Sequence, residues 1–464
     1  MNQYGFYRVT CATPKVEIAN PKENAKRILS LANQHKDSHI ILTPELSISS
    51  YSGMKLFHQQ SLLRDSLEAT FDLAHQLPAD QLVAVGLPLR VKNGLYNCLA
   101  MLNRQSIIGI IPKEFVPNYN EFEEGQWFAT AREEEIPDTV NLHGLEVPFG
   151  TRLIFENTSF RGPRARVFAE VCEAIWMTIP PSSFGAIAGA NIILNASTST
   201  ETVAKQDHRR HHVLSQSGRC VAAYAYCSSG PTESTNDVVC GGHNIIAECG
   251  SMLAESDRIG HNVNRLQYSI TADVDVEKIE NDRITQTSYA EQEKYVSEKE
   301  YRTIEFKSLD RSPKRTIRKI NAQPFVPKEG PKLEGRCREI FDIQTCGLAK
   351  RLECLPEDAP MSIGLSGGLD STQAFLVTMK TLEMIGRDPK YFNVVTMPGF
   401  GTTSRTLKNA ERLMESLPVT SYKIDIREAC FMEMKEHNCL YGYKPFGIDI
   451  SDRCYRASSL VKKE

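Results

Sequence analysis

Near the middle of the chain the sequence reads Phe168-Ala169-Glu170-Val171-Cys172-Glu173-Ala174-Ile175-Trp176. The apolar run from Ala165 to Val171 predicts a buried β-strand, and Cys172 follows directly after it. A cysteine in this position can present its thiol at the mouth of a site, within reach of a base. The motif alone favours an inert buried cysteine, because cysteine packs as a small hydrophobic residue in most cores. Evidence for a nucleophile therefore has to come from other parts of the chain.

The composition is typical of a soluble globular protein. The chain has 464 residues, enough for two or more domains, of which 41% are hydrophobic and 24% charged. The formal net charge of -3 provides no general attraction to nucleic acid or to anionic lipid. The N-terminal residues lack the apolar segment of a secretion signal, and no apolar run reaches the length of a membrane span. We expect a cytoplasmic protein without nucleic-acid or membrane partners.

The cysteine count agrees with that compartment. Thirteen cysteines without a secretion signal are expected to be reduced thiols. Their odd number and the absence of any Cys-x-x-Cys pair argue against a disulfide framework and against a zinc site.

Two other apolar runs also end in a polar residue with catalytic potential. The strand predicted at 40–42 leads into Pro44 and Glu45, and the second strand of a hairpin predicted over 96–111 leads into Pro112 and Lys113. Separately, a carboxylate at a strand end is often a turn residue, and a lysine there is usually solvated. The segment from 116 to 128, rich in aromatic residues, asparagine and glutamate, is expected to form a loop over a site.

Together the three residues can carry out one definite reaction. Glu45 as general base takes the thiol proton, Cys172 attacks an amide or nitrile carbon, and Lys113 stabilises the developing oxyanion. A neighbouring lysine also favours the thiolate. The coincidence of three such strand ends therefore favours the nucleophile interpretation of Cys172.

These residues lie in three segments that resemble the signatures of the nitrilase, or carbon–nitrogen hydrolase, superfamily. The segments are Thr43-Pro44-Glu45-Leu46, Pro112-Lys113 and Glu170-Val171-Cys172-Glu173. The resemblance covers residues 1–275 and implies an α-β-β-α sandwich with a catalytic Glu45-Lys113-Cys172 triad. It is closest to the glutaminase branch, which implies glutamine contacts by four residues, Tyr119, Glu173, Ser199 and Lys205. Ala174 departs from the aspartate that often follows Cys-Glu in the superfamily.

A histidine-rich segment allows a competing metal hypothesis. His208 and His211 or His212 have the spacing that places two ligands on one helical face. Arginines lie among the histidines and no cysteine is nearby, so a solvated or interface helix is the favoured interpretation.

Residues 276–330 are predicted to connect two domains, because the apolar period weakens there and prolines follow. The connector contains a basic run at 311–319, for which a solvated linker is a commoner meaning than a phosphate-binding patch.

The second half contains a phosphate-binding pattern. An apolar strand at 361–365 leads into Ser366-Gly367-Gly368-Leu369-Asp370-Ser371, and a helix is predicted from 372 to 385. Glycines allow backbone N–H groups to close around an anion, and a following helix adds its N-terminal donors. The loop is neither a Walker A motif nor a dinucleotide-binding fingerprint. A second strand at 392–398 and a helix from 406 predict a doubly wound parallel sheet.

This loop resembles the pyrophosphate loop of the N-type ATP pyrophosphatases. The resemblance implies ATP binding by seven residues, Ser366, Gly367, Gly368, Leu369, Asp370, Ser371 and Met397. It also makes Asp370 the candidate magnesium ligand.

A nitrilase-type glutaminase followed by such a loop is similar to one family, the glutamine-dependent NAD synthetases. The expected fold class is therefore α/β, a nitrilase-type α-β-β-α sandwich followed by a partial, doubly wound parallel ATP pyrophosphatase domain over 331–464. The resemblance implies that ammonia from glutamine travels through a tunnel and amidates ATP-adenylated deamido-NAD, releasing AMP and pyrophosphate. It also implies ATP and Mg²⁺, no prosthetic group, and a homo-oligomer.

The final residues lack the later ATP- and deamido-NAD-binding stretches of that family, so we expect either a fragment or a synthetase half that is not competent alone. The alternatives are a stand-alone amidase or glutaminase with an incompetent C-terminal half, and a non-catalytic partner of an assembly.

Overall fold

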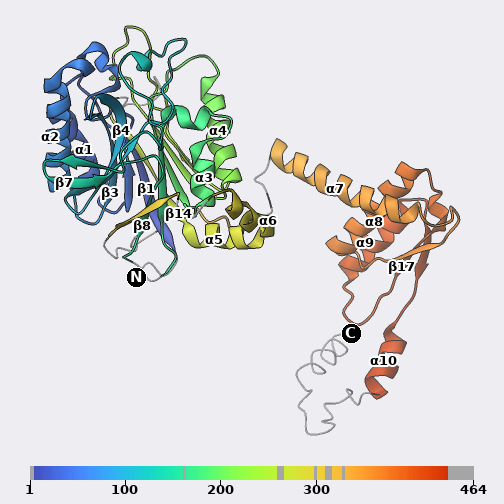
Figure 1. Cartoon of the computed structure of the whole chain (residues 1–464). Coiled ribbons are helices and arrows are strands. Elements are labelled where there is room, and N and C mark those ends of the chain that lie inside the picture. Colours follow the sequence, from blue (N-terminus) through green and yellow to red (C-terminus); the bar gives the residue numbers. More distant parts are fainter. Residues whose placement is uncertain are drawn as a thin grey trace, which may run out of the picture. The chain divides into compact units, whose positions relative to one another are not determined.

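The computed structural model describes residues 5–159, 162–258, 266–296, 300–308, 316–324, 326 and 330–436. The chain divides into two compact units between Lys319 and Ile320, and each is described separately. Figure 1 labels the elements of both units.

The first unit contains two stacked sheets. One has six strands in the order β14-β1-β2-β3-β4-β5. They are β1 (Phe6–Thr13), β2 (Ile40–Leu42), β3 (Leu82–Val91), β4 (Gly94–Asn103), β5 (Ser106–Pro112) and β14 (Tyr268–Asp275). β1, β2 and β3 are parallel, whereas β14, β4 and β5 pair antiparallel with their neighbours. The β4–β5 hairpin turns at Arg104 and Gln105, whose φ angles of 49° and 65° are those of a tight primed turn.

The other sheet has seven strands in the order β13-β12-β11-β10-β9-β8-β15. They are β8 (Leu153–Asn157), β9 (Arg166–Val171), β10 (Ile192–Ser197), β11 (Ala223–Ser228), β12 (Ile245–Glu248), β13 (Ser251–Glu255) and β15 (Arg302–Phe306). β9, β10 and β11 are parallel, so their carboxyl ends lie at the same edge of the sheet.

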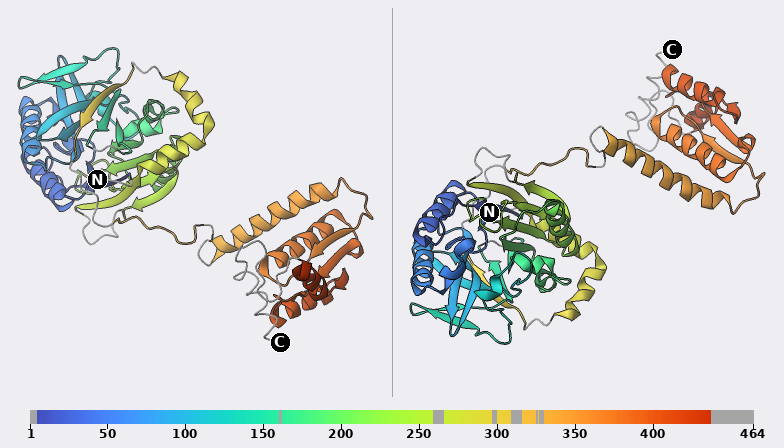
Figure 2. Two further views of the ribbon diagram at one scale, coloured as in Figure 1. Left: turned by 90° about the horizontal axis from the view of Figure 1, so that it is seen from below. Right: turned by 90° about the horizontal axis from the view of Figure 1, so that it is seen from above.

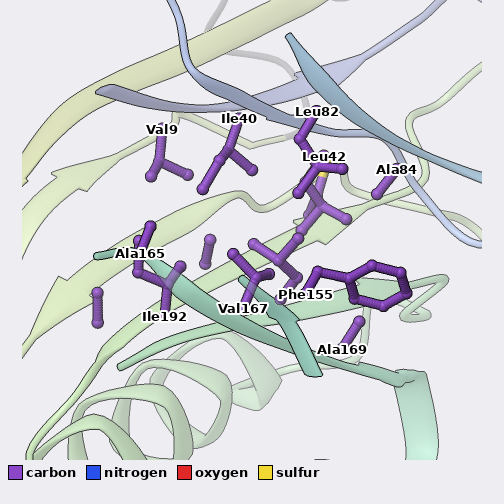
Figure 3. Packing of buried hydrophobic residues seen from close by; sticks show 14 of the residues in the cluster. Val9, Ile40, Leu42, Leu82, Ala84, Phe155, Ala165, Val167, Ala169 and Ile192 are labelled. Atoms are coloured by element: carbon purple, nitrogen blue, oxygen red, sulfur yellow. The ribbon is translucent and has the colours of Figure 1, made fainter. Parts of the chain in front are cut away.

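The main core fills the space between the two sheets. Figure 3 shows Val9, Ile40 and Leu82 of the first sheet pointing toward Val167 and Ile192 of the second. Because outer helices also cover both sheets, the central strands are buried on both faces and read as continuous apolar runs.

Helices form the two outer layers (Figures 1 and 2). α1 (Pro21–Gln34) and α2 (Gln60–Gln76) pack on the first sheet, and α3 (Pro181–Ile187) and α4 (Lys205–Arg219) pack on the second. α1 begins at Asn20, whose side chain accepts a hydrogen bond from the Glu23 backbone, with Pro21 in the first turn. The α-β-β-α sandwich predicted from the sequence is therefore confirmed.

The remaining elements of the first unit are short. They are the hairpin β6 (Thr139–Leu142) and β7 (Leu145–Pro148), the 3₁₀ helices η1 (Tyr51–His58), η2 (Glu124–Gln126), η3 (Cys172–Trp176) and η4 (Glu291–Tyr295), and the helices α5 (Val276–Thr285) and α6 (Thr287–Ala290).

Part of the region predicted as a connector, 276–330, is folded into the first unit. β15 forms a parallel pair with β8, and its Phe306 is buried in the main core. Beyond it, Arg318 forms hydrogen bonds of 2.6 and 2.8 Å with Glu248, and the Ile317 backbone donates one of 2.7 Å to Asp273. The described part of the basic run therefore binds carboxylates of its own unit. Residues 311–315 of that run lie outside the described residues.

The second unit has a three-stranded parallel sheet in the order β16-β17-β18. Its strands are β16 (Met361–Gly364), β17 (Phe392–Thr396) and β18 (Thr420–Lys423), and its helices are α7 (Pro331–Leu352), α8 (Leu369–Ile385), η5 (Pro389–Tyr391), α9 (Ser404–Glu415) and α10 (Arg427–Glu436). β18 was not expected from the sequence, because its polar residues Thr-Ser-Tyr-Lys lack an apolar pattern. The predicted parallel α/β sheet is confirmed.

One core cluster joins Leu352 of α7, Phe375 of α8 and Ala410 of α9 to Phe392 and Val394 of β17. Within the described residues these three helices thus share one face of the sheet, whereas a doubly wound sheet has helices on both faces. Across the described parts of both units, no helix is both long and apolar enough to cross a membrane.

Candidate active site

Three strand ends meet in the first unit. Glu45 follows β2, Lys113 follows β5 and Cys172 follows β9, and all three side chains are buried. β2 and β5 belong to one sheet and β9 to the other. The packing of the two sheets therefore brings together residues that are far apart in the sequence.

Lys113 is the centre of a buried ionic cluster. Its Nζ donates a hydrogen bond of 2.6 Å to Glu45 Oε1 and two of 2.7 Å to the carboxylate oxygens of Glu124. Burial favours the neutral amine, but the charges of Glu124 and Glu45 outweigh it and raise the pKa of Lys113 above its ordinary value. Lys113 is therefore a cation at neutral pH, held by two carboxylates.

Only one of the two carboxylate oxygens of Glu45 is hydrogen-bonded. Its Oε1 accepts from Lys113 and, at 2.6 Å, from Asn97 Nδ2, whereas its buried Oε2 has no hydrogen-bond partner in the described structure. Burial raises the pKa of Glu45 to about 7, partly opposed by the Lys113 charge. A carboxylate with this pKa and a free oxygen is suited to accept a proton near neutral pH.

A glycine in the neighbouring strand allows this placement. A Cβ added at Gly86 would lie 2.1 Å from the Leu46 nitrogen and 2.8 Å from the Glu45 carbonyl carbon. Leu46 itself has a φ of 50°. The turn that carries Glu45 can therefore pack on β3 only where β3 has no side chain.

Cys172 is the first residue of η3, at the sharp turn that directly follows β9. Its φ of 45° is rare for a residue other than glycine. The thiol is 3.6 Å from the Thr198 carbonyl oxygen, and the Ser197 hydroxyl donates to the sulfur at 3.2 Å. Burial raises the pKa of Cys172, the Glu45 charge adds to that shift, and Lys113 opposes it. The charges of Glu45 and Lys113 therefore act in opposite directions on the pKa of the thiol.

A cavity of about 980 Å³ opens beside the cluster. It reaches Glu124 and Tyr51, and the Tyr51 hydroxyl donates to Glu124 Oε1 at 2.8 Å. Its walls come from η1, the 120–128 loop, Thr200 and residues 234–238. The loop expected from the sequence at 116–128 therefore lines this cavity.

The four residues predicted to contact glutamine fall into two groups. The Tyr119 hydroxyl donates to Glu173 Oε1 at 2.6 Å, next to Cys172 in the sequence. Ser199 is buried and accepts a 2.9 Å hydrogen bond from Arg209. Lys205 begins α4 and donates to Thr200 Oγ1 at 2.8 Å. Thr200 lines the cavity, so the Lys205 ammonium group lies at its edge.

The histidine-rich segment lies in α4. His212 packs edge-on against Trp176, with ring centroids 4.6 Å apart. Across the described residues, no group of three or more histidine, cysteine or acidic side chains is arranged to hold a metal ion.

The second-unit loop joins β16 to α8, as predicted. The hydroxyl groups of Ser366 and Ser371 are 3.0 Å apart, and Ser371 Oγ accepts a 3.2 Å hydrogen bond from the Ser366 backbone. Gly367 has a φ of 75°, and a Cβ there would lie 2.0 Å from the Thr406 carbonyl oxygen. The loop therefore closes on itself and packs tightly against the start of α9.

Other predicted ATP-site residues surround this loop. Leu369 and Asp370 are exposed in the first turn of α8, and Met397, just past β17, is about half exposed. The Met397 methyl group would be 3.6 Å from a Cβ placed at Gly364, so Met397 lies over the end of β16.

Sequence reasoning missed Glu124, Asn97, Tyr51 and Ser197. Asn97 could have been found, because it is a polar residue beside the apolar run 98–102. Nothing in the sequence distinguishes Glu124 from the neighbouring Glu121 and Glu123, since only the fold of the loop turns one of them inward.

Comparisons with known proteins agree with the two-unit architecture. Residues 357–440 match the family model described as NAD synthase. The "Glutamine-dependent NAD(+) synthetase" of Mycobacterium tuberculosis (strain CDC 1551 / Oshkosh) is 36% identical over 434 residues, 91% of this chain and 62% of that protein. The protein of the same name from Mycobacterium leprae (strain TN) is 34% identical, with coverage of 93% and 63%.

A solved structure shows the same fold. The crystal structure of a glutamine-dependent NAD(+) synthetase from Cytophaga hutchinsonii matches with a TM-score of 0.51 at 18% identity, covering 98% of this chain and 70% of that chain. The chain spans about three fifths of the length of the two mycobacterial relatives. Over most of its own length the chain is therefore similar in sequence to glutamine-dependent NAD(+) synthetases, and it shares the fold of the Cytophaga hutchinsonii structure.

Proposed function

We propose that the first unit is a glutaminase in which Cys172 is the nucleophile, Glu45 the general base and Lys113 the oxyanion-stabilising group. The observation that carries this proposal is the buried cluster in which Lys113 bonds Glu45 and Glu124, Glu45 Oε2 stays unpartnered, and the charges of Glu45 and Lys113 act on the pKa of the buried Cys172 thiol. A buried free carboxylate oxygen near a cysteine is the acceptor that thiol activation requires.

The reaction has two halves. The thiol proton moves to Glu45, and the sulfur attacks the side-chain amide carbon of glutamine. Lys113 stabilises the negative charge on the amide oxygen, and the proton on Glu45 passes to the departing ammonia. Glu45 then activates a water molecule, which hydrolyses the thioester and releases glutamate.

Glutamine recognition is assigned to the cavity rim. Glu173 and Tyr119 form one polar pair, Lys205 bonds the cavity-lining Thr200, and Ser199 directly precedes Thr200 in the sequence. Glutamine carries both an ammonium and a carboxylate group, and Glu173 and Lys205 can pair with them respectively.

The second unit is proposed to bind ATP through Ser366, Gly367, Gly368, Leu369, Asp370, Ser371 and Met397. The positive φ of Gly367 and the exposed first turn of α8 leave backbone donors facing the loop, as phosphate binding requires. Asp370, an exposed carboxylate in that turn, would hold Mg²⁺, which neutralises phosphate charge when bound.

The complete reaction is proposed to be amidation of adenylated deamido-NAD by the released ammonia, giving NAD, AMP and pyrophosphate. This carbon–nitrogen ligase activity is supported by the names of the mycobacterial relatives. The chain is proposed to act as a homo-oligomer, which light scattering of the purified protein tests.

The test supplies the purified chain with deamido-NAD, ATP and Mg²⁺, with glutamine or ammonium as nitrogen donor. NAD and glutamate are measured in parallel. NAD from both donors supports the whole proposal. Glutamate without NAD supports the glutaminase alone, and absence of glutamate release from folded protein overturns it.

A further inference from the structure

The Cys172 sulfur has a neighbour outside the predicted triad. Ser197 ends β10, the strand that lies parallel to β9, and its hydroxyl is fully buried. Ser197 Oγ lies within hydrogen-bond distance of two possible acceptors, Cys172 Sγ at 3.2 Å and the Tyr226 hydroxyl oxygen at 2.7 Å. A serine hydroxyl has a single hydrogen, so it can be donated to only one of these acceptors at a time.

The charge on the sulfur determines which acceptor is preferred. A neutral thiol is a weak acceptor, and the tyrosine oxygen is the shorter contact, so the hydrogen points to Tyr226 in the resting site. A thiolate at the buried Cys172 position is an anion, and hydrogen bonds to ionised groups are about twice as strong as neutral ones. Formation of the thiolate therefore turns the Ser197 hydrogen toward the sulfur.

We propose that Ser197 is a further catalytic residue, which donates a hydrogen bond to the Cys172 thiolate, and that Tyr226 is a positioning residue that holds Ser197 and competes for its hydrogen. This inference deepens the proposed glutaminase function and rests on it. The proton balance is unchanged, because the thiol proton goes to Glu45 and the Ser197 hydrogen stays on its own oxygen.

The surroundings of the pair support this assignment. The Thr198 carbonyl oxygen, 3.6 Å from the sulfur, accepts the thiol hydrogen and cannot stabilise a thiolate. Lys113 has both neighbouring carboxylates as hydrogen-bond partners. Of the two described groups within hydrogen-bond distance of the sulfur, the Ser197 hydroxyl is the one that can donate to it.

The same serine acts again when the enzyme intermediate breaks down. Sulfur loses its negative charge when the thioester forms, and Ser197 can then return its hydrogen to Tyr226. When water attacks the thioester, sulfur leaves as thiolate and accepts the hydrogen once more. Ser197 should therefore accelerate both acylation and deacylation.

The inference is tested by the pH dependence of Cys172 alkylation with iodoacetamide, read by mass spectrometry of the peptide that contains Cys172. This measurement follows the thiolate directly and needs no turnover. We expect Ser197→Ala to raise the midpoint by about one pH unit and to lower glutamate release at least about tenfold. Ser197→Thr, which keeps the hydroxyl, should restore most of both.

Tyr226→Phe should act in the opposite direction on the midpoint. Removing the competing oxygen commits the Ser197 hydrogen to the sulfur, so the alkylation midpoint falls by a few tenths of a unit. A purely structural role for both residues cannot produce shifts of opposite sign. The matched controls are Ser217→Ala and Tyr7→Phe, which remove buried hydroxyls that bond backbone carbonyls elsewhere in the fold.

The outcomes separate the inference from the proposed function. An unchanged midpoint in Ser197→Ala, with glutaminase activity present in the wild type, overturns the inference alone. A shifted midpoint in a protein without glutaminase activity supports the role of Ser197 and overturns the proposed function. If thermal melting shows that Ser197→Ala does not fold, the alkylation midpoints of Ser197→Thr and Tyr226→Phe test the inference instead. An upward shift of the midpoint in Tyr226→Phe would overturn the proposal that Tyr226 competes for the Ser197 hydrogen.

Discussion

Both carboxylate oxygens of Glu124 accept 2.7 Å hydrogen bonds from the ammonium group of Lys113. Glu124 is thus the second carboxylate partner of the lysine beside Glu45, although it comes from a loop rather than a strand end. A buried lysine with a single carboxylate partner would be free to change position, whereas two partners define where its charge lies.

Glu124→Gln should keep the shape of this contact but remove one negative charge. We expect kcat for glutamate release to fall roughly a hundredfold, because the lysine loses its second ionic partner. The Glu124 charge also raises the pKa of Glu45, so the acidic limb of the pH profile should move to lower pH. Glu135→Gln, a change of an exposed carboxylate that does not line the cavity, is the control and should be silent. Wild-type kinetics in Glu124→Gln would show that the contact is dispensable.

The pH dependence of glutamate release should reflect Glu45. Burial raises the pKa of Glu45 to about 7, and only the ionised carboxylate can accept the thiol proton. The rate of glutamate release should therefore be low below about pH 7 and should rise as the pH increases through about 7. Steady-state kcat/KM between about pH 5 and 9 checks this, with thermal melting at each pH to exclude unfolding. A flat profile across this range would rule out Glu45 as the titrating base.

Cys172→Ala should abolish glutamate release and any glutamine-driven NAD formation. Ammonia-driven NAD formation should survive, because free ammonia does not need the thiol. Cys98→Ala, which alters another buried cysteine in β4, is the matched control and should keep glutaminase activity. Loss of both activities in a folded Cys172→Ala protein would contradict the division of labour between the units.

Gly86→Ala should damage the site without touching any polar residue. The added Cβ would lie 2.1 Å from the Leu46 nitrogen, so the turn that carries Glu45 must move. We expect the free energy of unfolding to fall by about 3 kcal/mol, measured by thermal denaturation. We also expect kcat for glutamate release to fall under conditions in which the variant is still folded, because the turn that carries Glu45 has moved. Gly347→Ala, on an open face of α7, is the control. Undisturbed turnover in Gly86→Ala would mean that the turn adapts.

Gly367→Ala should impair ATP binding by the second unit. The position combines a φ of 75° with a Cβ site 2.0 Å from the Thr406 carbonyl oxygen, so alanine must open the loop. We expect at least a tenfold loss of ATP affinity by isothermal calorimetry in the presence of Mg²⁺. Gly401→Ala, where an added methyl group meets open space, should bind as wild type. Equal affinity in both variants would argue against nucleotide binding at this loop.

The sequence alone determined the strand-end residues and the loop of the second unit. Apolar runs locate buried strands, and a polar residue that follows such a run is expected to lie at the edge of the sheet, where the strand ends. Glu45, Lys113 and Cys172 were therefore predictable as strand-end residues, and so was the passage from β16 through the Ser-Gly-Gly segment into α8, whereas the two-sheet sandwich was expected from the resemblance to the nitrilase superfamily.

Only the tertiary structure decided which other residues complete the site. Glu124 and Tyr51 lie outside the strands, in segments with no periodic pattern, and their roles depend on how those segments fold over the cluster. Ser197 reaches the sulfur because β10 lies parallel to β9, a pairing between distant segments. β15 and β18 likewise gain their structure from neighbouring strands. Local sequence encodes periodicity and turns, whereas contacts between distant segments arise from the packing of the whole unit.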